Sequence, residues 1–148
     1  MKISTKGRYG LRILLDLALH SGEKLRLIRD IAQSQQISEK YISRLIIDLR
    51  RAGMVKSVRG SKGGYELAKV PDEITLLDVV EVMEGPLSIV DCVLEPGRCK
   101  RNQMCVTREI WRNLNSEFRE SMRKVTLREI IELCQKQDHS DGNWDYCI

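Results

Sequence analysis

Residues 27–67 contain the pattern that most constrains the fold of this chain. Residues 27–34 are expected to form a short helix, because their apolar side chains fall on one face. A tight connection at 35–37 leads to Ser38, which is a good N-cap for a second helix that stops at Gly53. Two helices joined so closely, the second of them polar and basic, predict a helix-turn-helix.

A glycine-rich hairpin completes this pattern. Residues 55–58 and 65–67 read as paired strands, and the segment 59–64, with the sequence RGSKGG, supplies the turn between them. An apolar row at helical spacing predicts a further helix over residues 6–20. Together these elements predict a winged helix-turn-helix, a mainly α fold with a small β-hairpin wing.

A capping box opens the last helix of this domain. Thr75 and Asp78 have the required spacing, apolar residues follow at helical intervals, and Gly85 ends the helix. We therefore divide the chain into four parts. They are the winged helix-turn-helix domain at 1–85, a cysteine-containing loop at 86–105, a long helix with a final helix at 106–137, and a tail at 138–148.

One long helix is expected to begin at residue 106. Its apolar row repeats every four positions and consists of Val106, Ile110, Leu114, Phe118 and Met122. A long helix that leaves a small domain is expected to pair with a second copy of itself, so we expect a homodimer; packing on its own domain is the alternative. The final helix is expected to open at Thr126 and to end near Gln137.

Charge is distributed unevenly along the chain. Residues 1–70 contain 15 Lys and Arg and 6 Asp and Glu, whereas residues 71–148 contain 10 Lys and Arg and 15 Asp and Glu. A basic first half favours a polyanion such as DNA as its partner, and the acidic second half does not.

Composition predicts a cytoplasmic protein that is not an enzyme. The N-terminal apolar stretch is short and is interrupted by Arg12 and Asp16, so we expect no signal peptide and no membrane partner. Five cysteines are an odd number for a secreted disulfide framework. The two histidines, His20 and His139, are accompanied by no nucleophile–base signature, phosphate loop or paired catalytic carboxylates.

The candidate DNA-contacting residues fall in three segments. A recognition helix enters the major groove by its N-terminal residues, and a cationic glycine-rich wing suits the narrow minor groove. Arg44 has the chemistry to pair with guanine and Glu39 to accept a hydrogen bond from cytosine. The candidates are Lys2, Ser4, Thr5, Lys6, Ser38, Glu39, Lys40, Tyr41, Ser43, Arg44, Arg59, Ser61 and Lys62. A winged helix that binds another protein instead of DNA is the alternative.

Three cysteines follow the winged domain within a short stretch, at Cys92, Cys99 and Cys105. The proline, glycine and charged residues between them predict a flexible loop. Thiolates on such a loop suit an iron–sulfur cluster, zinc or reversible oxidation, and the residues alone leave these possibilities open. Of the remaining cysteines, Cys134 falls on the apolar side of the last helix, and Cys147 lies near the end of the chain.

The chain resembles the bacterial IscR/NsrR/CymR-type winged-helix regulators. The resemblance lies in the segments MKISTKGRYG and ISEKYISRLIIDLRRAGMVKSVRGSKGGY and in the three cysteines that follow them. It covers nearly the whole chain and is most specific in residues 1–85. It implies a homodimer that binds a palindromic operator, regulates transcription and dimerises through the long helix. By position it places Ser38, Glu39, Lys40, Tyr41, Ser43, Arg44 and Arg59 in the DNA-reading region of the family.

The resemblance also implies a cofactor, because three-cysteine members of that family bind an iron–sulfur cluster. Here the cluster would use the three cysteines, with 2Fe–2S favoured over 4Fe–4S, and would control genes of iron–sulfur assembly or of cysteine and sulfur metabolism. The chain departs from the family pattern in three ways. The first cysteine gap has six residues instead of five, Arg108 replaces the histidine ligand of IscR, and Arg8 replaces the aspartate of NsrR-like members. Since a guanidinium is a poor ligand, the fourth ligand stays open among Asp91, Glu109, a small thiol and solvent.

The tail suggests an alternative function. Residues 144–148, WDYCI, are similar to the ends of proteins that insert into the active site of cysteine synthase, including cysteine-metabolism repressors of the same family. The alternative is a cluster-free repressor of cysteine metabolism that responds to thiol oxidation or to cysteine synthase bound through Ile148. A tail that folds back on the core is the other interpretation.

Overall fold

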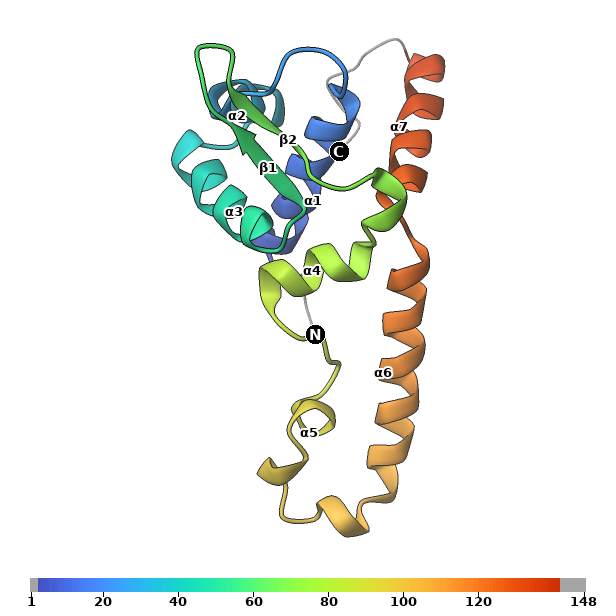
Figure 1. Ribbon diagram of the computed structural model, residues 1–148. Helices are drawn as coiled ribbons and strands as arrows, with labels where there is room; N and C mark the ends of the chain where they lie inside the picture. Colours follow the sequence, from blue (N-terminus) through green and yellow to red (C-terminus); the bar gives the residue numbers. More distant parts are fainter. Residues whose placement is uncertain (1–2, 142–148) are drawn as a thin grey trace.

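In the computed structural model, which describes residues 3–141, a winged helical head is joined to a long arm (Figure 1). The head contains α1 (Thr5–Leu19), α2 (Ile28–Gln35), α3 (Glu39–Arg51), β1 (Val55–Val58), β2 (Gly64–Leu67), the 3-10 turn η1 (Pro71–Glu73) and α4 (Leu76–Glu84). The arm contains α5 (Asp91–Leu94), the 3-10 turns η2 (Pro96–Arg98) and η3 (Asn102–Met104), and α6 (Val106–Lys124). The last helix, α7 (Leu127–Asp141), returns to the head.

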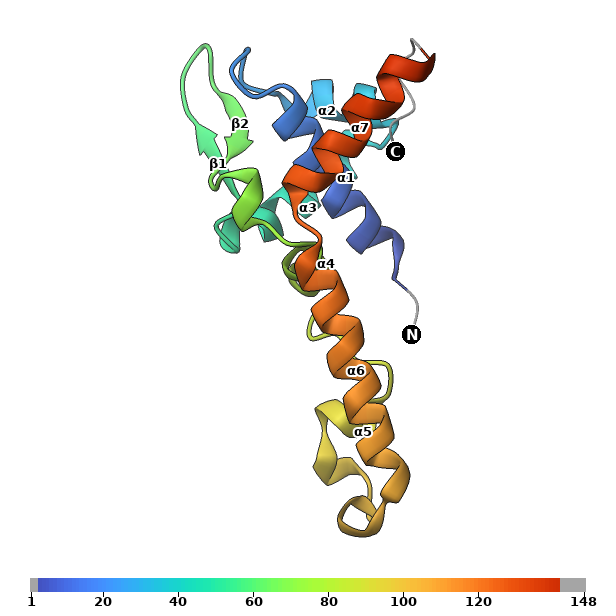
Figure 2. The ribbon, with the colours of Figure 1, turned by 90° about the vertical axis from the view of Figure 1, so that its right-hand side faces the viewer.

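The arm projects from the head as two antiparallel passes of the chain. Figure 2 shows α6 running the length of the arm, with α5 beside it and the cysteine-containing turns toward its far end. The joint between α6 and α7 is fixed to the start of α4. There the Leu76 N–H donates to the Val125 carbonyl at 2.9 Å, and the Leu127 N–H donates to the Ile74 carbonyl at 2.8 Å.

Local capping explains where α3 and α4 begin. The Ser38 hydroxyl accepts a hydrogen bond from the Tyr41 N–H, and Thr75 and Asp78 form the predicted capping box. The turn between α2 and α3 depends on Gln36, whose φ of 53° is the left-handed conformation. That conformation lets the chain reverse within the short connection that the sequence predicts.

The wing is an antiparallel hairpin in which Val55 pairs with Leu67 and Val58 with Gly64. The Gly63 N–H closes the turn on the Gly60 carbonyl at 3.0 Å. A Cβ added to Gly63 would lie 2.3 Å from the Val58 carbonyl oxygen, so the turn requires glycine there. The lack of room for a Cβ therefore explains why the wing has glycine at position 63.

The core of the head lies where α1 crosses α3, α4 and α7. The helices α1 and α4 approach closely because α1 has glycine at the crossing: a Cβ on Gly10 would lie 2.7 Å from Met83 Cγ. The fully buried side chains include Ile13, Leu14, Leu15, Ile31, Ile42, Leu45, Ile46, Leu49, Ile74, Leu77, Val79 and Leu127. The core therefore joins the helix-turn-helix to α4 and α7.

The predicted fold is confirmed, with differences at its edges. The last helix continues to Asp141, past the end expected near Gln137. The segment 86–105, predicted as a flexible loop, contains α5, η2 and η3 instead of purely irregular backbone. Pro96 explains one of these turns, since its fixed φ suits the first position of a helix. Between residues 3 and 141, no helix combines the length and the apolar character that crossing a membrane requires.

Candidate nucleic-acid interface and cysteine loop

The N-terminal end of α3 presents most of its predicted contact residues to solvent. Ser38, Glu39, Lys40 and Arg44 are exposed, and Ser43 is half-buried. The Ser43 hydroxyl donates to the Glu39 carbonyl at 2.7 Å, so its oxygen remains able to accept a further hydrogen bond.

Tyr41 packs inward against α1, unlike the exposed residues beside it on α3. Its ring meets the ring of Tyr9 edge-on, with centroids 5.9 Å apart, and it packs against the core of the head. The guanidinium of Arg12 lies over the Tyr9 ring, 5.2 Å from its centroid. Tyr41 therefore fixes α3 against α1.

The N-terminus of α1 is tied to other elements of the head. The Ser4 hydroxyl donates to Glu84 Oε1 at 2.6 Å, and the Gly7 N–H donates to the same oxygen at 2.9 Å. Partial burial raises the pKa of Glu84, but these hydrogen bonds outweigh it and hold that pKa below its ordinary value. Lys6 pairs with Asp48 of α3 at 3.1 Å. Thr5 is exposed, and Lys2 lies outside the described residues.

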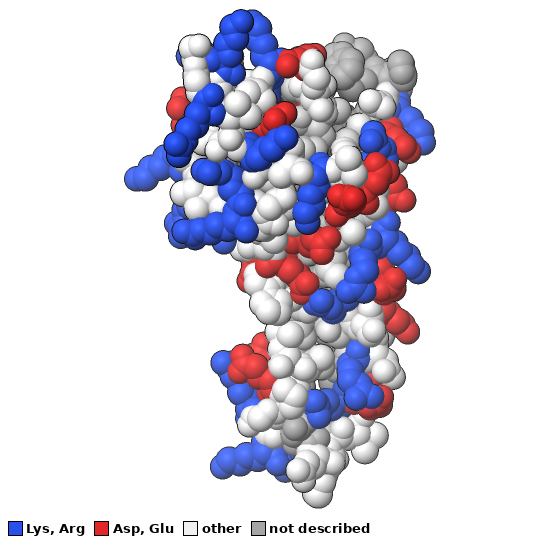
Figure 3. Space-filling model, viewed as in Figure 1, with Lys and Arg blue, Asp and Glu red and all other residues white. Residues whose placement is uncertain are grey.

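The tip of the wing is cationic and exposed. Arg59, Ser61 and Lys62 all face solvent. Figure 3 shows Lys and Arg side chains gathered over the hairpin and α3, while Asp and Glu are more frequent on the side of α4 and α7. The charge asymmetry of the sequence thus becomes a basic surface on the helix-turn-helix and wing, which is the electrostatic footprint of a nucleic-acid partner.

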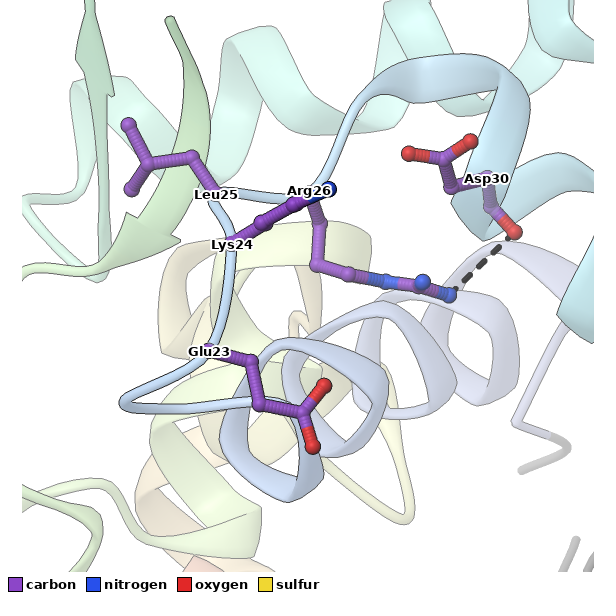
Figure 4. A pocket seen from close by; sticks show the side chains of 5 residues that line it. All are labelled: Glu23, Lys24, Leu25, Arg26 and Asp30. Carbon is purple, nitrogen blue, oxygen red and sulfur yellow. Dashed lines mark hydrogen bonds between the residues drawn. The ribbon is translucent and has the colours of Figure 1, made fainter. Parts of the chain in front are cut away.

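A buried acidic residue holds α1, α2 and the wing together. Asp16 is 1% exposed and accepts hydrogen bonds from Arg26 Nε at 2.8 Å and from the Ser34 hydroxyl and Gln35 amide. Figure 4 shows Arg26 extending toward the Asp30 carbonyl, to which it also donates at 3.3 Å. The Arg26 backbone bridges to Tyr65 of β2. Arg26 therefore connects the wing to the first two helices.

The three sequence-predicted metal ligands lie in one loop but on different turns. Cys92 is in α5, Cys99 follows η2, and Cys105 immediately precedes α6; all three are half-buried. Within residues 3–141, the structure brings together no group of three or more His, Cys, Asp or Glu side chains able to hold a metal ion. The loop supplies the thiols without gathering them into one ligand set.

The Cys105 thiol has contacts that lower its pKa. Its sulfur lies 3.3 Å from the Thr107 hydroxyl. The hydrogen bond from Thr107, followed by the backbone N–H of Arg108, holds the pKa of the Cys105 thiol below its ordinary value. These contacts stabilise the thiolate form of Cys105 relative to the thiol, and the thiolate is the form that binds metals.

Arg108 lies one turn into α6, next to this thiol. Its Nε is buried and has no hydrogen-bond partner among the described residues. A guanidinium has no lone pair for a metal, but an unpaired N–H suits an anionic acceptor. Arg108 is thus unsuited as a ligand and suited as a hydrogen-bond donor to a negatively charged group.

Two side chains of α6 anchor the start of the loop. Asn115, which is 6% exposed, accepts a hydrogen bond from the Ile89 N–H at 3.0 Å. Arg119 donates to the Leu87 carbonyl at 3.1 Å and forms a two-pronged ion pair with Glu81 of α4. Partial burial raises the pKa of Glu81, but the hydrogen bonds from Arg119 and from the Leu87 N–H outweigh it and lower that pKa. The loop root is therefore fixed to both α4 and α6.

The outer half of α6 leaves much of its apolar row uncovered. Val106 is 82% exposed, Ile110 54% and Leu114 44%, whereas Phe118 is half-buried and Met122 is buried against α4. Trp111, beside this row, is 40% exposed. Only the part of the row near the head is covered by the described residues of the chain itself.

Sequence reasoning missed the polar residues that position these surfaces. They are Asp16, Arg26, Glu81, Glu84, Asn115 and Arg119. The one available signal was a charged residue, Asp16, within the apolar α1 segment. Arg26 lies in the connection between α1 and α2, and the remaining residues lie on helix faces that look like ordinary solvated surface.

Comparison with known proteins identifies the family to which the chain belongs. The model of the Rrf2 family, described as iron-dependent transcriptional regulators, matches residues 3–133. The transcriptional regulator CymR of Bacillus subtilis is 42% identical over 130 residues, which cover 88% of this chain and 89% of that protein. IscR of Aliivibrio salmonicida is 36% identical over 141 residues, covering 95% of this chain and 83% of that regulator.

Solved structures agree with the sequence relatives. The structure of B. subtilis CymR, named the global cysteine regulator, matches with a TM-score of 0.74 and 39% identity over 89% of this chain and 97% of that one. T. potens IscR matches with a TM-score of 0.73 and 35% identity over 95% of this chain and 91% of that one. The chain therefore belongs to the Rrf2 family of transcriptional regulators.

Proposed function

We propose that this chain is a homodimeric, operator-binding regulator whose segment 86–105 carries an iron–sulfur cluster. The observation that carries the DNA-binding part is the basic surface formed by α3 and the wing (Figure 3). Its contacts would be the thirteen candidate residues of the α1 N-terminus, α3 and the wing, with α3 in the major groove and Arg59 in the minor groove. The homologous regulators support this assignment and weigh against an enzyme.

The exposed row of α6 supports dimerisation. Val106, Ile110 and Leu114 form a continuous apolar strip on a helix that projects from the head. A second copy of α6 has the same strip, and pairing the two would remove both from water. A dimer would also present two recognition helices, as a palindromic operator requires.

The chemistry of the three loop thiols supports an iron–sulfur cluster, because thiolates are its usual protein ligands. Cys92, Cys99 and Cys105 would be the protein ligands, and Asp91, Glu109, a small thiol or solvent would supply the fourth. Bound there, the cluster would respond to iron supply and oxidants by being lost or oxidised. Arg108 would donate a hydrogen bond to the anionic group instead of binding iron, which its unpaired Nε supports.

A continuous set of contacts links the loop to α3. Arg119 joins the loop root to Glu81 on α4, Glu84 of α4 caps α1, and Lys6 of α1 pairs with Asp48 of α3. The state of the loop would change DNA affinity through these contacts only if the cluster binds one arrangement of the helices better than another.

Anaerobic reconstitution with iron and sulfide tests the cluster. The wild-type protein should take up both and develop visible absorption bands, and Cys99→Ser should lose most of this uptake. Cys134→Ala is the matched control, because Cys134 is buried in the core of the head and should leave the uptake unchanged. A wild-type protein that stays colourless and binds neither iron nor sulfide contradicts the cluster.

A cluster-free repressor of cysteine metabolism is the second candidate. It is favoured by two observations: the described cysteines are not gathered into a metal site, and a relative is named the global cysteine regulator. Its partner would be cysteine synthase, bound through Ile148, which lies outside the described residues. Deleting residues 146–148 should abolish a complex with cysteine synthase; a complex that survives the deletion rejects this partner.

A further inference from the structure

The recognition helix α3 exposes one large apolar side chain. Ile47 is 46% exposed, whereas Ile42, Leu45, Ile46 and Leu49 of the same helix are at most 1% exposed. With 3.6 residues per turn, positions 40, 44, 47 and 51 form a single row along the helix, opposite the buried face. That row reads Lys40, Arg44, Ile47 and Arg51. Ile47 thus lies in the middle of a cationic row, on the side of α3 turned away from the core.

The surroundings of Ile47 are open and basic. A surface hollow between α3 and β1 is lined by Ile47, Arg50, Arg51, Val55, Lys56 and Ser57. Lys56 pairs with Glu66 at 3.2 Å and Arg51 approaches Asp48 at 3.9 Å, both at the surface. Cations on both sides of an apolar group favour a partner that is itself anionic with an apolar feature, and they disfavour a purely apolar protein surface.

Duplex DNA has one apolar group on its major-groove edge, the 5-methyl group of thymine. We propose that Ile47 contacts a thymine methyl group and makes the regulator prefer thymine at one fixed position in each half-site. This inference rests on the proposed DNA-binding function. Arg44 lies one turn nearer the helix N-terminus and would read an adjacent base, while Arg51 lies one turn beyond, where phosphates come within reach.

A binding selection followed by single-methyl deletions tests this contact. Duplexes that bind full-length wild-type protein are enriched from a random library, and each thymine of the enriched site is then replaced singly by deoxyuridine. Deoxyuridine keeps the base pair and removes only the methyl group. In each half-site, replacing one particular thymine by deoxyuridine should weaken wild-type binding about fourfold. This is the effect expected from the loss of one buried methyl group. Ile47→Ala should bind the thymine and deoxyuridine duplexes equally.

Val58→Ala is the matched control. Val58 is an apolar wing residue exposed to a similar extent, 42%, and its variant should keep the wild-type discrimination. Thermal melting of both variants checks that they remain folded.

The results of this experiment distinguish a failure of the DNA-binding function from a failure of the Ile47 contact. Failure to enrich any duplex would overturn the DNA-binding function and this inference with it. An enriched site in which no thymine is sensitive in the wild type, or in which Ile47→Ala keeps the same sensitivity, would overturn the role of Ile47 and leave DNA binding intact.

Discussion

At the scale of single residues, a buried carboxylate organises the head. Asp16 accepts hydrogen bonds from α2 and from Arg26, whose backbone joins the wing. Removing one partner of a buried ion pair leaves the other uncompensated, so we expect Asp16→Ala to lower the free energy of unfolding by about 3 kcal/mol. Denaturant unfolding at one fixed protein concentration measures this loss.

Asp48 provides the comparison for Asp16. It also pairs with a cation, Lys6, but both side chains are partly exposed to water. Because surface ion pairs contribute little, Asp48→Ala should cost less than about 1 kcal/mol. Equal costs for the two variants would show that the Asp16 network has no special structural role.

At the scale of elements, the wing depends on backbone packing at its tip. A side chain on Gly63 would collide with the Val58 carbonyl, so Gly63→Ala must displace backbone. We expect a cost of about 1–3 kcal/mol, localised in the hairpin, and weaker DNA binding as Arg59 and Lys62 are moved. Amide exchange in β1 and β2, measured beside operator affinity, tests both effects.

Gly97 is the matched glycine in the cysteine loop. A Cβ there would meet nothing within 4 Å, and its φ is not in the left-handed range. Gly97→Ala should therefore leave both hairpin exchange and DNA affinity unchanged. If the two glycine variants behave alike, the steric explanation of the wing turn is wrong.

At the scale of the whole molecule, the outer part of α6 belongs to the arm, whereas α3 and the wing belong to the head (Figures 1 and 2). The exposed apolar row of α6 is therefore separate from the basic surface that is proposed to bind DNA. In the proposed dimer, Ile110→Glu would place a charge in the centre of the apolar strip. We expect this variant to be mainly monomeric at micromolar concentration in sedimentation equilibrium, and to lose operator binding because a monomer has one recognition helix.

Val70→Glu is the control for Ile110→Glu. Val70 is exposed to the same degree, 55% against 54%, but lies between β2 and η1 and is not part of the apolar row of α6. It should leave the molecule dimeric. A wild-type protein that is monomeric under the same conditions, or an Ile110→Glu variant that stays dimeric, contradicts the assigned interface.

Features that depend on neighbouring residues could be predicted from the order of amino acids. Ser38 caps α3, Thr75 and Asp78 open α4, and the glycines of 60–64 shape the wing, because capping and turn geometry act over a few positions. The helix-turn-helix and its exposed N-terminal residues could be predicted for the same reason.

The pairing of the polar groups, by contrast, became visible in the packed fold and not in any local pattern. Asp16 meets Arg26, Glu84 meets the start of α1, and Arg119 meets Glu81 through contacts between segments distant in sequence. Helical spacing alone likewise could not tell that the α6 row is covered near Met122 and open near Val106. Burial and long-range pairing depend on how whole elements pack, and no local pattern encodes that packing.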